Sequence, residues 1–63
     1  MGYVLTDLET GEVYAGQFIE YDVDVNGTGL VLLDGAVVLN VPGIESFEQL
    51  EAVFLQEFQV VQM

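Results

Sequence analysis

Carboxylates are the only strongly charged side chains that this sequence offers for chemistry. Its 63 residues contain 11 Asp and Glu and no Lys, Arg, His or Cys. Nearly all common nucleophile-and-base mechanisms use His, Lys or Cys at some step, so these mechanisms are excluded. A pair such as Glu20 and Asp22 could act as acid and base only in a pocket that shifts one pKa, and an open strand provides none. We therefore expect that the protein is not an enzyme.

One segment resembles half of a calcium site. Asp22 to Gly27, with the sequence DVDVNG, matches the first half of an EF-hand loop. The second half fails, because its last position requires a bidentate Glu and holds Leu33, and because the flanking residues have the pattern of strands. We predict no metal site and no cofactor. If calcium bound, its ligands would be Asp22, Asp24 and Asn26.

A regular line of negative charge is the strongest functional signal. Glu20, Asp22 and Asp24 alternate with apolar residues, so on a strand they would share one face at intervals of ~6.6 to 6.8 Å. This spacing is comparable to that of successive phosphates in a nucleic acid. With the acids of a turn and a helix, the predicted partner-binding residues are Glu20, Asp22, Asp24, Asp34, Glu48 and Glu51.

The formal charge of −11 restricts the classes of partner. It repels phosphates and anionic lipids, so we expect neither direct nucleic-acid binding nor membrane binding. It would attract a basic protein, and one candidate is a nucleic-acid-binding enzyme that the chain inhibits as a DNA mimic. Small phage-type inhibitors that mimic DNA are similar in composition. The alternative is that the charge only keeps a very apolar small protein soluble.

Two turn signals organise the elements that would carry these acids. Asn26-Gly27 and Asp34-Gly35 favour two-residue hairpin turns, which predicts three consecutive antiparallel strands between residues 11 and 41. The alternation changes phase within the second strand, 13–25, which indicates a bulge near Gly16 to Ile19. We predict a mainly β (α+β) fold, an antiparallel meander that forms a small barrel or a strongly bent sheet of four or five strands.

The C-terminal third of the chain changes pattern. Pro42-Gly43 ends the meander, and Ser46 with Gln49 is typical of an N-cap and capping box, so a helix is predicted at about 47–56. The tail 58–62 favours a strand that closes the sheet beside the first strand, 3–8. We expect a single domain, 1–63.

An alternative function follows from the apolar residues. The hairpin from Leu30 to Val41 is apolar on both faces, so one face fills the core and the other needs a cover from the helix or another subunit. The protein could then be a structural protein that forms a homo-oligomer, or an engineered chain with no native function. The predicted oligomer interface consists of Leu30, Leu32, Val38, Phe47, Leu50 and Phe54.

The second and third strands resemble a known family. The glycine and apolar spacing of residues 11–34 is similar to the first motif of the Sm-like family of small SH3-like barrels. In that family a loop Asp and Asn help hold RNA bases, and Asp22 and Asn26 would correspond to them. Three residues separate Asn26 from Leu30 where the family has none, and Pro42-Gly43 stands near where a basic residue before glycine is expected. Because the chain has no Lys or Arg, RNA binding does not carry over. The resemblance implies a bent five-stranded barrel and assembly through strand edges. The matching positions are 11–18, 21–22, 26, 30–32 and 34.

Location is predicted by what the sequence lacks. The residues from Met1 have neither the basic region nor the long apolar region of a signal peptide. No apolar run approaches the ~20 residues of a membrane span. We expect a soluble, intracellular protein of the cytoplasm, in the host cell if it is encoded by a phage.

Overall fold

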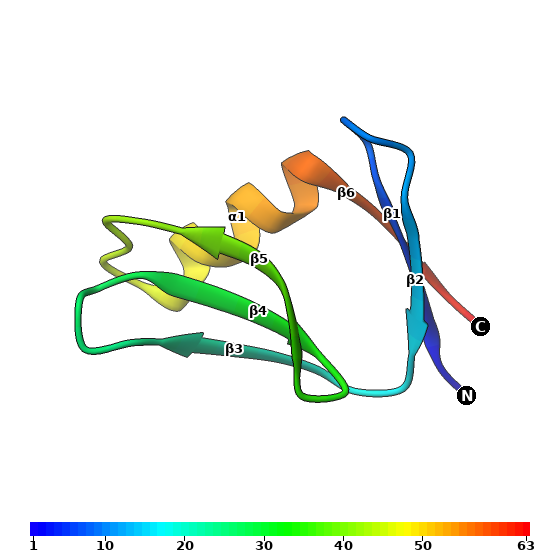
Figure 1. Cartoon of the computed structure of the whole chain (residues 1–63), viewed down its shortest axis with the longest axis horizontal. Helices are drawn as coiled ribbons and strands as arrows, with labels where there is room; N and C mark the ends of the chain where they lie inside the picture. The colour runs from blue at the N-terminus through cyan, green and yellow to red at the C-terminus, as the bar shows by residue number, and fades with distance from the viewer.

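The computed structural model describes residues 1–63, which form six strands and one helix (Figure 1). The strands make two antiparallel sheets of three strands, with the orders β2-β1-β6 and β3-β4-β5. The predicted class, mainly β with a short helix near the C-terminus, is confirmed, and the sheets do not close into a barrel. The elements are β1 Tyr3–Asp7, β2 Val13–Gly16, β3 Ile19–Val23, β4 Gly29–Leu33, β5 Ala36–Val41, α1 Phe47–Glu57 and β6 Phe58–Gln62.

The long strand expected over 13–25 is interrupted at Gln17 and Phe18. Here the chain passes from one sheet to the other, so the bulge predicted near Gly16 to Ile19 is wrong. The change in alternation marks the passage between sheets. The Asp34 carboxylate accepts the N–H groups at this break, from Gln17 at 3.0 Å and from Phe18 at 2.9 Å. The Asp34 side chain, which comes from a distant hairpin, thus accepts the backbone N–H groups that have no partner in either sheet.

Asp34 and Gly35 form the two-residue turn between β4 and β5 that the sequence predicts. Their φ values are 51° and 82°, the left-handed conformation at both positions of a type I′ turn. Asp and Gly tolerate this conformation better than most residues. Further along, β5 carries Val38 as an extra residue opposite the step from Val31 to Leu32, and this is the bulge that the structure contains.

The turn between β3 and β4 is wider than the predicted Asn26-Gly27 turn. The Asp24 carboxylate accepts the N–H groups of Asn26 at 2.8 Å and of Thr28 at 3.0 Å. Within this loop only Gly27 has a positive φ, of 75°. Because Asp24 binds the loop backbone, β3 ends at Val23, two residues before the predicted end.

Helix α1 begins where the sequence predicts and ends one residue later. Ser46 is the N-cap, and its Oγ accepts the N–H of Gln49 at 3.1 Å. The Gln49 side chain accepts from the N–H of Glu45 at 2.9 Å, one residue before the position that a capping box would use. β6 follows the helix directly and pairs antiparallel with β1, as predicted for the tail.

The core lies between α1 and the two sheets. The helix crosses the face of β4 that carries Val31 and Leu33, and Figure 1 shows it linking this sheet to β6. It approaches β4 so closely that a Cβ atom on Gly29 would lie 2.9 Å from Leu50 Cδ1. The Phe54 ring is 5.4 Å from that of Phe58 and 6.2 Å from that of Tyr21. The buried cluster is Leu5, Val31, Leu33, Ile44, Leu50, Phe54 and Phe58.

Two leucines of α1 provide a matched test of this packing. Leu50 has no exposed surface, whereas Leu55 is 56% exposed. We expect Leu50→Ala to lower the free energy of unfolding by about 3 kcal/mol, because it leaves a cavity in a small core. Leu55→Ala should cost less than about 1 kcal/mol. Urea unfolding followed by circular dichroism measures both, and equal losses would contradict the packing of the helix.

Candidate functional site

The β3-β4-β5 sheet has one face that no other element covers. Val31 and Leu33 of β4 lie in the core, so Leu30 and Leu32 between them point to the opposite side, where they are half-buried. β3 places its two acids on this side, because Glu20 pairs with Leu32 and Asp22 with Leu30. Carboxylates and leucines therefore lie side by side. We call this surface the outer face, and it consists of Glu20, Asp22, Leu30, Leu32 and Val37.

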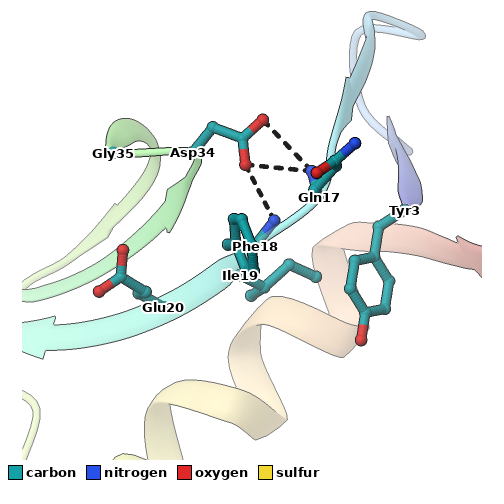
Figure 2. Close-up of a pocket in the computed structure, with 7 residues that line it drawn as sticks. All are labelled: Tyr3, Gln17, Phe18, Ile19, Glu20, Asp34 and Gly35. Atoms are coloured by element: carbon teal, nitrogen blue, oxygen red, sulfur yellow. Dashed lines mark hydrogen bonds between the residues drawn. The ribbon is translucent and has the colours of Figure 1, made fainter. Parts of the chain in front are cut away.

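A hollow of about 750 Å³ lies where the two sheets meet, at the start of β3 (Figure 2). Phe18 stands at its edge with 68% of its surface exposed, a high value for a large aromatic side chain. No sequence pattern marks Phe18 or Tyr3 as functional, although Phe18 falls where the alternation changes phase. The hollow is lined by Tyr3, Gln17, Phe18, Ile19, Glu20, Asp34 and Gly35.

The structure separates the predicted partner-binding acids. Glu20 and Asp22 remain neighbours on the exposed side of β3, but the predicted row ends there, because Asp24 lies in the following loop and binds its backbone. Asp34 binds the N–H groups at the break between β2 and β3. Its carboxylate is therefore occupied in holding the fold. The two helix acids are exposed: Glu48 lies in the first turn of α1, and Glu51 accepts the Tyr21 hydroxyl at 3.4 Å.

The predicted oligomer-interface residues do not form one surface. Leu50 and Phe54 are buried in the core of the single chain, so they cannot contact a second copy in this fold, and their assignment is corrected. The helical spacing of Leu50 and Phe54 predicts an apolar face of the helix, and such a face can pack into the core or against another chain. Leu30 and Leu32 lie on the outer face, Val38 packs half-buried against the core, and Phe47 is exposed at the start of α1.

The possible calcium ligands are not assembled. Asp24 accepts backbone N–H groups of its own loop, and Asp22 accepts the N–H of Val23 at 2.8 Å. No group of three or more acidic side chains in the structure is placed to hold a metal ion. In this structure the Asp24 carboxylate therefore acts as a cap of its own loop.

All charged side chains of the molecule are negative. No carboxylate is buried and no cationic side chain exists to pair with one. The pKa of Tyr21 is raised, first because burial disfavours the phenolate and then because the Glu51 charge and hydrogen bond oppose ionisation. The pKa of Tyr14 is raised by the same first cause and then by the charge of Glu12. The structure contains no helix long and apolar enough to cross a membrane.

Comparison of the chain with protein-family models, curated proteins and solved structures found no match. The resemblance to the Sm-like family stays a prediction. A functional proposal for this protein must therefore come from the outer face, the hollow and the charge.

We predict that Asp34 stabilises the junction of the sheets. Asp34→Gly keeps a residue that tolerates positive φ but removes the acceptor of two N–H groups, and it should cost about 2 kcal/mol of unfolding free energy. Asp34→Asn keeps one side-chain oxygen and should cost less. Glu20→Gln removes the same charge without breaking a backbone bond, so thermal or urea unfolding should find it close to the parent. A Gly variant as stable as Glu20→Gln would contradict this role.

The raised tyrosine pKa values give a pH dependence with a defined sign. As the pH rises through about 10, tyrosines of the unfolded chain ionise before Tyr21 of the folded chain, so the stabilisation that is complete below this pH is progressively lost. Glu51→Gln removes the neighbouring charge and should lower the pKa of Tyr21 toward its ordinary value. Glu48→Gln removes a charge that does not reach Tyr21. NMR titration of the Tyr21 ring compares the two variants, and equal shifts would exclude the Tyr21–Glu51 contact.

Proposed function

We propose that this protein is an acidic binding module that recognises a basic surface of another protein through its outer face and the adjoining hollow. The observation that carries the proposal is the placement of Glu20 and Asp22 of β3 beside the uncovered Leu30 and Leu32 of β4, with the exposed Phe18 immediately before β3. Buried aromatic and aliphatic anchors give most of the affinity of an interface, while rim charges set the association rate and the choice of partner. This surface offers both.

The charge supports a basic partner. With a formal charge of −11 and no cationic side chain, the molecule has no patch that attracts an acidic protein, a nucleic acid or an anionic membrane. A groove that binds nucleic acid is one basic surface with the required field. DNA mimicry is the specific form of the proposal, and the absence of cationic side chains supports it. A cationic side chain on the binding surface would be repelled by the positive charge of a groove that binds phosphates. The mimic would present the pair Glu20 and Asp22 on the outer face rather than one straight row of three acids.

Homo-oligomerisation is the second candidate, and the uncovered outer face favours it. Leu30, Leu32 and Val37 offer an apolar strip on this face, whereas Phe47 is exposed separately at the start of α1. The two candidates respond to salt with opposite signs. Salt screens repulsion between copies that carry like charges and so promotes self-association, whereas it weakens a complex with a basic protein. Solution mass measured over a range of salt and protein concentrations distinguishes them.

The binding surface is tested by paired charge variants in a pull-down from a lysate eluted with a salt gradient. Glu20→Gln with Asp22→Asn should lower affinity for the captured basic protein at least about tenfold, because both acids lie on the outer face. Glu9→Gln with Glu57→Gln removes the same charge near the turn between β1 and β2, and it should have a smaller effect. Excess duplex DNA should displace the module from its partner if it is a DNA mimic.

Two results would contradict the proposal. Equal losses in both variants would show that net charge alone, rather than the outer face, is recognised. Affinity that does not change between about 50 and about 300 mM salt would show that the complex is not held by charge.

A further inference from the structure

We propose that β3 binds an extended basic segment of the partner by strand addition, so that the segment becomes a fourth strand of the β3-β4-β5 sheet. This inference rests on the proposed function and specifies how the partner is held. Strand addition gives affinity through main-chain hydrogen bonds and selectivity through alternate side chains. It therefore needs an edge strand with unpaired backbone groups and side chains that suit one kind of partner.

The backbone of β3 supplies the unpaired groups. Asp34 N–H donates to the Phe18 carbonyl at 2.9 Å and Asp24 N–H donates to the Thr28 carbonyl at 3.0 Å, which fixes the phase of the ladder between β3 and β4. Bonded pairs recur at every second residue of an antiparallel ladder, so the two residues Glu20 and Asp22 direct their backbone groups toward β4. Their neighbours on β3 direct theirs to the open edge.

Two residues of that edge are free to pair. The N–H of Val23 is already accepted by the Asp22 carboxylate at 2.8 Å. No turn or side-chain hydrogen bond involves the N–H of Ile19 or Tyr21. Together these two residues present two donors and two acceptors at the two-residue spacing that an added strand requires. In Figure 1, β3 is the outermost strand of its sheet, with β4 on one side and no strand on the other.

The side chains distinguish β3 from the other edges. The edge strands of the two sheets are β2, β6, β3 and β5, and only β3 has charged residues within its bounds. A second copy of this chain would place its own Glu20 and Asp22 close to these acids, and like charges on neighbouring strands are destabilising. The same pair favours a strand with Lys or Arg at alternate positions. The acids therefore select against self-pairing and for a basic segment.

The hollow provides a contact for the inward-facing side chains of an added strand. Residues of the incoming segment opposite Glu20 and Asp22 would face outward, and the residues between them would face inward, beside Ile19 and Tyr21. Ile19 and Phe18 line the hollow at this end of β3. The preferred segment thus alternates cationic residues with apolar ones, and one apolar side chain would enter the hollow (Figure 2).

The test uses a capped synthetic peptide of alternating Lys and Val and two N-methylated forms of it. Backbone methylation removes an N–H group without changing charge. In an antiparallel addition the Val N–H groups face β3, so methylation of two central Val residues should weaken binding at least tenfold while methylation of two Lys residues should not. In a parallel addition the assignment is reversed. Strand addition is supported when one methylated peptide binds and the other does not.

Amide hydrogen exchange of the protein provides the second measurement. The amides of Ile19 and Tyr21 should gain at least tenfold protection with the unmodified peptide, while those of Glu20 and Asp22, already bonded to β4, should change little. Two methylated peptides that bind as well as the parent, with no new protection, would overturn strand addition. Salt-sensitive binding in that same experiment would leave the proposed function standing, so the two failures are distinguishable. Absence of binding by every peptide would also overturn the inference, and the lysate experiment would then judge the proposed function separately.

Discussion

The contact on which this structure depends is the one between the Asp34 carboxylate and the backbone at the break between β2 and β3. The core of this chain of 63 residues lies between two sheets, and Gln17 and Phe18 carry the chain from β2 in the first sheet to β3 in the second. That passage leaves the N–H groups of Gln17 and Phe18 without ladder partners. One carboxylate, fixed by a left-handed turn, accepts both, and the position of Phe18 beside the hollow follows from it.

Charge and core are separated completely in this molecule. The buried cluster contains only apolar residues, and every carboxylate has access to water. With no cationic side chain to pair with, the acids contribute through hydrogen bonds to backbone N–H groups, as Asp7, Asp24 and Asp34 do at three turns. These bonds need no countercharge. The remaining repulsion lowers stability and at the same time leaves Glu20 and Asp22 available to a cationic partner.

Local signals in the sequence predicted the parts of the fold that local interactions determine. The Asp34-Gly35 turn, the Ser46 cap and the apolar tail were recognisable because each depends on residues within a few positions. The break at Gln17 and Phe18 has the same sequence pattern as a bulge, because both shift the alternation by one residue. The partner that distinguishes them, Asp34, lies far along the chain.

The candidate site shows the same limit. Glu20 and Asp22 were predicted from strict alternation, but the row did not include Asp24 in the structure because its carboxylate caps its own loop. Leu50 and Phe54 have a spacing that fits a core or an interface equally well. The hollow at Phe18 could not be predicted, since it exists only where two sheets and the Asp34 turn meet.

The direct junction of α1 and β6 has a mechanical consequence. Glu57 ends the helix and Phe58 begins the strand, so no flexible residue separates the rotation of one from the register of the other. A shift of β6 by one residue along β1 would turn Phe58 out of the core and rotate the helix by about 100° about its axis. The packing of the helix therefore fixes the register of β6, and the pairing of β6 with β1 fixes the orientation of the helix. Such a molecule should resist sliding and sub-global opening, and it should hold the edge of β3 in a fixed position for whatever docks there.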